Sequence, residues 1–129
     1  LFRHYLRRYP LETCAIEMKD SLGKDSLPFS EVKQAQIDYG MAIKGNKGVM
    51  IRTTGVEGLP DYIFLRNEPS YIVIKFIKSI EIIDVETFEL ERKRSKRKSL
   101  TSERASQISI KSIKLSPTPA RPTPKWAYN

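Results

Sequence analysis

Two side chains near the start of the chain, Glu17 and Lys19, have the types and the spacing for phosphodiester chemistry. They end an apolar run that predicts a strand over residues 13 to 19. Residues two apart in a strand project from the same face, so the carboxylate and the ammonium are expected side by side. A carboxylate is a hard ligand for Mg²⁺, and a nearby cation can orient water or offset charge on a phosphate. A solvated strand face is the other interpretation of this spacing.

The segment that follows predicts a helix over residues 30 to 44, after the stretch Ser26-Leu27-Pro28-Phe29. Ser30 is expected to cap its N-terminus. Gln34 and Gln36 lie two apart on this helix, so their side chains point about 200° from each other and only one can face a given site. The positions at helical spacing, which are expected to form the buried face, are Val32, Ala35, Tyr39 and Ala42.

These residues carry a resemblance to a known nuclease family. The chain resembles the RecU-type Holliday junction resolvases, a branch of the PD-(D/E)XK superfamily, in Glu17-Met18-Lys19, Ser26-Leu27-Pro28-Phe29, Gln36 and Lys98-Ser99-Leu100. The resemblance implies a restriction-endonuclease-like core, Mg²⁺ or Mn²⁺ as cofactor, and a homodimer that cuts branched DNA. It also implies that Glu17 binds the metal, that Lys19 positions the attacking water, and that Gln36 lies near that water or the phosphate.

The second metal ligand of that superfamily has no obvious counterpart here. The superfamily places an aspartate on the strand before the glutamate, but no aspartate precedes Glu17 in this chain. Upstream residues outside the chain, a rearranged site and a degenerate site are the three accounts that stay open. Asp61 is the candidate for a rearranged ligand, because it and the run Tyr71 to Lys75 imitate the superfamily's order, with Val73 in place of the carboxylate. Alternatively, Asp61 closes a loop before a strand.

The positive charge is concentrated in the last third of the chain. Residues 1 to 90 hold 12 Lys and Arg against 13 Asp and Glu, whereas residues 91 to 129 hold 11 against 2, and the whole chain has a net charge of +8. Such a run attracts a polyanion and releases its counterions, so we expect phosphate contact; a solvated loop, a localisation signal and a membrane-surface patch are the alternatives. The basic run consists of Arg92, Lys93, Arg94, Lys96, Arg97 and Lys98.

Length predicts one domain over residues 1 to 115, which the resemblance implies is nuclease-like, and composition predicts a proline-rich disordered tail over residues 116 to 129. Residues 1 to 9 read as the later part of a helix that Pro10 stops, which suggests that the domain is truncated at its N-terminus. No apolar run reaches the roughly 18 residues of a membrane span. We therefore expect a cytoplasmic protein without a membrane partner.

The remaining pattern is typical of an α/β fold. Strands are expected at residues 47 to 53, 62 to 65, 71 to 76 and 80 to 85, followed by a helix at 86 to 94, a helical turn at 101 to 106 and a strand at 107 to 113. This order predicts a mixed β-sheet flanked by helices. The expected function is a Mg²⁺-dependent, structure-selective DNA endonuclease, a Holliday junction resolvase-like enzyme of DNA recombination and repair. The alternative is a non-catalytic nucleic-acid-binding module that retains a degenerate nuclease fold.

Overall fold

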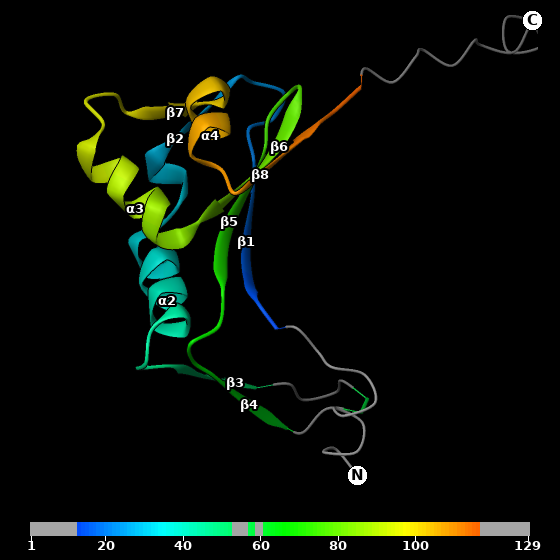
Figure 1. Cartoon of the computed structure of the whole chain (residues 1–129), viewed down its shortest axis with the longest axis vertical. Helices are drawn as coiled ribbons and strands as arrows, with labels where there is room; N and C mark the ends of the chain where they lie inside the picture. The colour runs from blue at the N-terminus through cyan, green and yellow to red at the C-terminus, as the bar shows by residue number, and fades with distance from the viewer. Residues whose placement is uncertain (1–12, 53–56, 59–60, 117–129) are drawn as a thin grey trace, which may run out of the picture.

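A computed structural model of the chain describes residues 13 to 52, 57 to 58 and 61 to 116, and shows an α/β protein with a mixed sheet and three α-helices in those residues (Figure 1). The elements in chain order are β1 (Ala15–Asp20), β2 (Ser26–Pro28), a 3-10 turn (Phe29–Glu31), α2 (Gln34–Lys44), β3 (Val49–Arg52), β4 (Tyr62–Leu65), β5 (Ser70–Lys75), β6 (Ser79–Asp84), α3 (Val85–Arg94), β7 (Ser99–Thr101), α4 (Ser102–Ile108) and β8 (Lys111–Lys114).

The main sheet has four strands in the order β1-β5-β6-β8. β1 runs parallel to β5, with Ala15 opposite Ser70, whereas β5, β6 and β8 pair antiparallel. A parallel pair needs a long crossover connection, and here the chain between the two strands supplies α2. The predicted mixed sheet is therefore confirmed.

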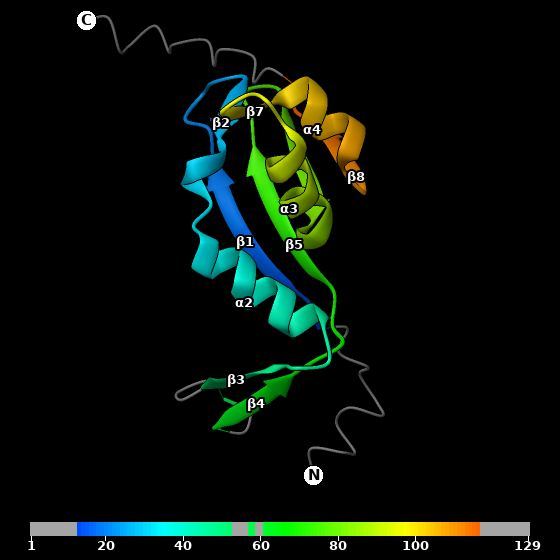
Figure 2. The same cartoon turned by 90° about the vertical axis from the view of Figure 1, so that its left-hand side faces the viewer.

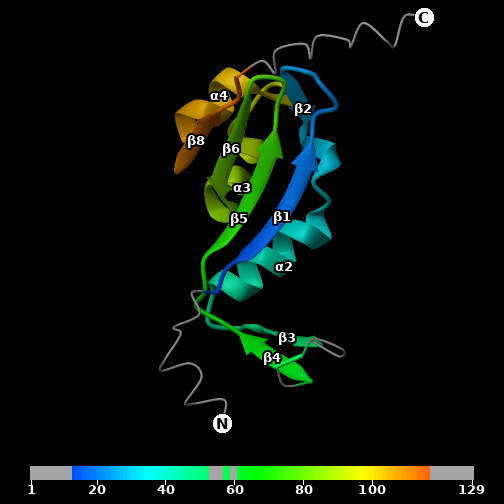
Figure 3. The same ribbon diagram turned by 90° about the vertical axis from the view of Figure 1, so that its right-hand side faces the viewer.

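Helices α2 and α3 pack on one face of this sheet, as Figure 2 shows. That face carries alternate residues of each strand, which are the buried ones in β5 and β6. Figure 3 looks onto the opposite face, which none of the described helices covers. The side chains of Ile16 and Met18 point to that face and are 55% and 74% exposed. The sheet therefore has one core-facing and one open face in the part of the chain described.

The core lies between the helices and the covered face of the sheet. Phe88 of α3 is fully buried and meets Phe29 at a centroid separation of 5.8 Å and a tilted angle of 58°, an arrangement that aromatic rings favour. Ile72, Ile74 and Ile83 of the sheet are buried beneath them.

Helix α2 begins four residues later than the sequence pattern predicts. Ser30 lies in the 3-10 turn rather than at the helix N-cap, and Lys33 occupies the N-cap position. The expected buried face is confirmed only at Val32, which is 2% exposed and precedes the helix. Tyr39 is 48% exposed, Ala35 is exposed and Ala42 is half-buried. The residues of α2 that are buried against the sheet are Ile37, Gly40 and Ile43.

The side chain of Asp84 caps the N-terminal end of helix α3. The Asp84 carboxylate accepts hydrogen bonds from the backbone N–H groups of Glu86 and Thr87, which otherwise lack partners at a helix start. Lys44, at the end of α2, binds Asp84 and Glu86 at 2.8 and 3.0 Å. The hydrogen bond with Asp84 is the main cause of a raised pKa at Lys44. This cluster joins the end of α2 to the start of α3.

Two short strands are absent from the sequence-based prediction. β2 pairs antiparallel with β7, with Leu27 opposite Leu100, and the Phe29 N–H donates to the carbonyl of Lys98. Both leucines are buried. The two segments that carry part of the family resemblance, 26 to 29 and 98 to 100, therefore lie side by side.

Strands β3 and β4 form a separate antiparallel hairpin between α2 and β5. It lies beyond the C-terminal end of α2, next to the start of β5 (Figure 1). The backbone N–H groups of Asn67 and Glu68 donate to the carbonyls of Gly45 and Ile43 at 2.9 and 3.1 Å. These bonds fix the base of the hairpin to the end of α2.

Some expectations concern residues outside the described part of the chain. The helix at residues 1 to 9 and the disordered tail, apart from Ser116 itself, both lie there. Among the described residues, none of the helices combines the length and the apolar composition needed to cross a bilayer.

The first prediction concerns the core contribution of Phe88. Phe88→Ala should lower the free energy of unfolding by about 3–5 kcal/mol, because it leaves a cavity beneath α3. Leu90→Ala is the matched control on the same helix, since Leu90 is 46% exposed, and it should cost less than about 1 kcal/mol. Urea unfolding followed by circular dichroism measures both. Equal decreases in the two variants would contradict this description of the core.

Candidate active site and basic surface

Glu17 and Lys19 lie on the face of β1 that is turned toward α2. The alternation along β1 leaves both side chains partly buried, at 36% and 19% exposure, while Met18 between them points to the open face. The Lys19 Nζ lies 3.5 Å from the Glu17 Oε1. The structure therefore brings the carboxylate and the ammonium side by side, as their spacing predicts.

Gln36 joins this pair from the first turn of α2. Its Nε2 donates to the Glu17 Oε1 at 2.8 Å, and its Oε1 accepts from the backbone N–H of Lys33 at 2.9 Å. One side chain thus satisfies an unpaired donor at the helix start and orients the carboxylate. Gln34 faces elsewhere and binds Asp38. The selection of Gln36 over Gln34 as the residue that faces the site agrees with these contacts.

A small pocket of about 90 Å³ opens beside Glu17. Gln36 and Tyr39 of α2 line one side of it, and Ser70 and Tyr71 of β5 line another. A half-exposed carboxylate at the edge of a pocket is accessible to a cation or to water, which a fully buried one is not. Sequence reasoning missed Tyr39 and Ser70, because it placed Tyr39 in the core and began the strand at residue 71, after Ser70.

Asp61 does not line this pocket. It directly precedes β4 and is exposed. The other end of β4 is the one fixed to α2, so Asp61 lies at the outer end of the hairpin, about 13 Å of strand from its base. Within the described residues, no three His, Cys, Asp or Glu side chains are grouped closely enough to hold a metal ion.

The basic run divides into two parts. Arg92 and Lys93 belong to α3 and form ion pairs with Glu89 at 2.9 and 3.2 Å, and Arg92 also binds Gln34. Partial burial alone would raise the pKa of Glu89, but the hydrogen bonds from Arg92 and Lys93 outweigh it and lower that pKa. The remaining cations are exposed and form no ion pair with any described carboxylate: Arg94, Lys96, Arg97 and Lys98.

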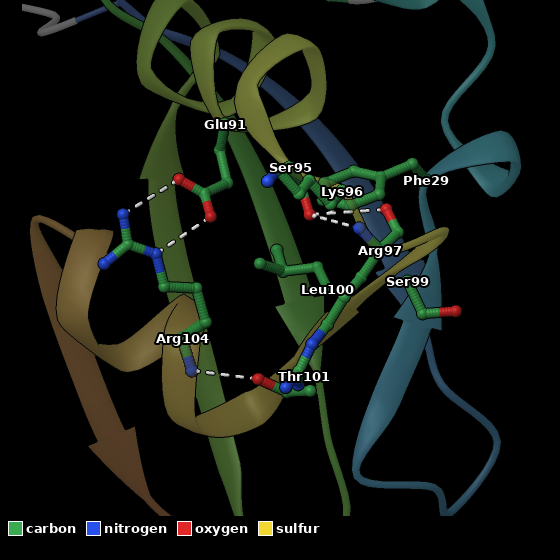
Figure 4. Close-up of a pocket in the computed structure, with 9 residues that line it drawn as sticks. All are labelled: Phe29, Glu91, Ser95, Lys96, Arg97, Ser99, Leu100, Thr101 and Arg104. Carbon is green, nitrogen blue, oxygen red and sulfur yellow. Dashed lines mark hydrogen bonds and ion pairs between the residues drawn. The ribbon is translucent and has the colours of Figure 1, made fainter.

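A second pocket of about 290 Å³ is lined by two of these exposed cations, Lys96 and Arg97 (Figure 4). The buried Leu100 also lines it. On one side Arg104 of α4 faces Glu91 of α3, with two hydrogen bonds of 2.8 and 3.0 Å. The basic surface is therefore hollowed beside the Glu91–Arg104 ion pair.

The pair Glu91 and Arg104 gave no signal in the sequence. The two residues are 13 positions apart and come from different helices, so neither periodicity nor spacing connects them. The hydrogen bond from Arg104 is the main cause of a lowered pKa at Glu91, and the same bond raises the pKa of Arg104.

A scan of the chain against protein-family models and a search of curated proteins found no match.

The second prediction follows from the lowered pKa of Glu91. A carboxylate with a lowered folded-state pKa contributes stability above its ordinary value of 4.5 and loses it as the pH falls through the folded-state value. Glu91→Gln should therefore be less stable than wild type at about pH 6, and this difference should shrink toward about pH 3. Urea unfolding at the two pH values measures it. Glu103→Gln, at an exposed position of α4, is the control; a difference that does not change with pH would contradict the role of the ion pair.

Proposed function

We propose that the chain is a metal-dependent endonuclease that hydrolyses phosphodiester bonds in branched DNA, with a restriction-endonuclease-like core similar to that of the RecU-type resolvases. The observation that carries the proposal is the contact of Glu17 with both Gln36 and Lys19 at the edge of an open pocket. A carboxylate held on a rigid strand by a helix amide and next to an ammonium is suited to phosphate chemistry. The order of elements that builds it, a strand, a helix and a parallel strand, is compatible with the proposed core.

Glu17 supplies one of the oxygen ligands that a hard divalent cation needs. Glu17 offers a carboxylate that is 36% exposed and borders the pocket. Mg²⁺ prefers six oxygens and keeps several waters, so one protein carboxylate leaves places for water and for a substrate phosphate. A second carboxylate is part of the proposal, and Asp61 is the candidate for it among the described residues. When bound, Mg²⁺ or Mn²⁺ polarises the phosphate and lowers the pKa of bound water.

The residues of the chain have distinct tasks in this mechanism. Gln36 keeps the Glu17 carboxylate in one orientation, because its amide is hydrogen-bonded at both ends. The Lys19 ammonium, 19% exposed and 3.5 Å from the carboxylate, holds a water or a phosphate oxygen near the pocket. The exposed cations from Arg94 to Lys98 bind the phosphates of the DNA without reading its sequence. The homodimer implied by the resemblance stays a prediction.

The third prediction tests the carboxylate and the ammonium. Glu17→Gln keeps the shape but removes the charge, so cleavage of a branched DNA substrate in Mg²⁺ should fall by at least about 10²-fold while DNA binding persists. Lys19→Ala should slow cleavage and leave metal affinity largely intact. Gel-based nicking assays with and without Mg²⁺ measure cleavage by both variants. Calorimetric titration of Mg²⁺ measures the metal affinity. Equal cleavage by wild type and Glu17→Gln would end the nuclease proposal.

Asp61→Asn belongs in the same series, because it distinguishes two accounts of the second ligand. Loss of both metal binding and cleavage would assign the second carboxylate to Asp61. Unchanged metal binding and cleavage would make Asp61 a loop residue at the hairpin end.

The second candidate function is a module with the same fold that binds DNA without cutting it. The exposed cations Arg94, Lys96, Arg97 and Lys98 favour it, because they would bind phosphate whether or not Glu17 holds a metal. Retained DNA binding without any Glu17-dependent cleavage would select this candidate.

The fourth prediction concerns those cations. Replacing Arg94, Lys96 and Arg97 with Ser should weaken binding to all DNA sequences alike and reduce the salt dependence by up to about 0.9 log unit of slope for each phosphate that the protein no longer neutralises. Replacing Lys24, Lys78 and Lys111 with Ser removes the same charge from exposed positions elsewhere and is the control. Fluorescence anisotropy at several salt concentrations measures both. Equal slopes in the two triple variants would contradict the assignment of a local phosphate site.

A further inference from the structure

The β3–β4 hairpin presents two different faces because its side chains alternate. Leu65 is buried, and Val49, Ile51 and Ile63 are half-buried, so this face is the inner one. The other face carries Met50, Tyr62 and Phe64, which are 60%, 56% and 50% exposed. Exposed aromatic side chains at alternate positions of a strand have no role in the core of this chain.

The outer face combines these aromatic rings with arginines. Met50 pairs with Phe64 and Arg52 pairs with Tyr62 across the two strands, so all four share the face. Arg66 follows at the next alternate position, and its guanidinium carbon lies 6.0 Å from the centre of the Phe64 ring. Among the described positions of this face, none carries an acid.

Gly48 allows the Phe64 ring to take up its place on the hairpin. A side chain at Gly48 would collide with the ring, since a Cβ built there would lie 2.5 Å from the Phe64 Cζ and 3.0 Å from the Arg66 Cβ. Gly48 also has a φ of +75°, which favours glycine. The ring therefore rests against backbone on one side and against Arg66 on another, yet half of its surface stays open.

We propose that this aromatic face, defined as Met50, Arg52, Tyr62, Phe64 and Arg66, binds single-stranded DNA by stacking unpaired bases on Tyr62 and Phe64. Stacking on aromatic rings beside cations is how single strands are bound without sequence preference. Tyr62 and Phe64 are two residues apart, a rise of about 6.8 Å along a strand, which is twice the roughly 3.4 Å advance of one nucleotide in a stacked strand. Each ring can therefore hold a separate base. Arg66, beside the Phe64 ring, meets a phosphate of the strand.

This inference rests on the proposed function for its choice of ligand. If the pocket at Glu17 cuts branched DNA, the aromatic face narrows the substrate class to branches with an unpaired strand, such as a flap or a splayed fork. A fully paired junction offers no bases for the two rings. The described positions of the face include two arginines and no acid, which argues against an apolar contact with a second copy of the chain.

The fifth prediction tests stacking directly, with the full chain and in EDTA so that no cleavage occurs. Phe64→Leu keeps an apolar side chain but removes the π-face, so affinity for a (dT)15 strand should fall at least about fivefold, while affinity for a 15-base-pair duplex stays the same. Phe64→Trp should retain or raise the affinity for the single strand. Binding of the strand should also quench the fluorescence of the tryptophan added in Phe64→Trp. Wild type, which has a single tryptophan, is the reference. Fluorescence anisotropy and emission measure these effects.

Controls separate stacking from loss of fold and from other partners. Ile77→Ala, at a 51% exposed position outside the hairpin, should bind (dT)15 as wild type does, and all variants should keep the wild-type melting temperature. Arg66→Gln should reduce the salt slope of (dT)15 binding by about 0.7.

Several outcomes would overturn the aromatic face as a binding site for single strands. These are no binding of (dT)15 by wild type, equal binding by Phe64→Leu, equally weakened binding of single strand and duplex, or a preference for anionic phospholipid vesicles over (dT)15. None of them depends on cleavage. Absence of Glu17-dependent cleavage would instead contradict the proposed nuclease function. The (dT)15 measurements would still decide whether the aromatic face binds single strands.

Discussion

The parallel pairing of β1 with β5 is the constraint on which the remaining structure depends. Parallel neighbours cannot be joined by a tight turn, so the chain must leave the sheet after β1 and return to enter β5 from the same end. The intervening chain becomes α2, which covers the face shared by the two strands. Every side chain of β1 that points to this face must then meet α2, and Glu17 meets Gln36 for this reason.

The site therefore depends on packing as much as on its own residues. Gln36 contacts Glu17 with the same amide group that caps the helix, so the carboxylate is oriented only when α2 has formed and docked. The basic surface depends on a different long-range contact, the pairing of β2 with β7, which holds the loop after α3 against the core. The candidate active site and the basic surface, on separate parts of the fold, are thus each fixed by contacts distant in sequence.

Local pattern was sufficient for the elements with a clear period. The strands near residues 62 to 65, 71 to 76 and 80 to 85 and the helix near 86 to 94 follow from alternation and helical spacing, and the structure has them within one residue of those bounds. β2 and β7 have three residues each, too few for a period, and they exist only because each pairs with the other. The prediction of Ser30 as the helix cap was wrong. Phe29 and Val32 are buried, and the chain before α2 therefore forms a 3-10 turn at residues 29 to 31 followed by an extended backbone at Val32. The proximity of Glu17 to Gln36 needed the family resemblance, because 19 residues separate them.

The attachment of the β3–β4 hairpin has a consequence for how the chain could change over time. The hairpin enters and leaves at nearly the same point, where Asn67 and Glu68 are bonded to the end of α2, so the four-stranded sheet does not depend on its length. Such a segment is a module that can be lengthened, shortened or exchanged without disturbing the fold that carries it. The ligand preference proposed for the hairpin could then change in evolution independently of the site proposed beside the four-stranded sheet.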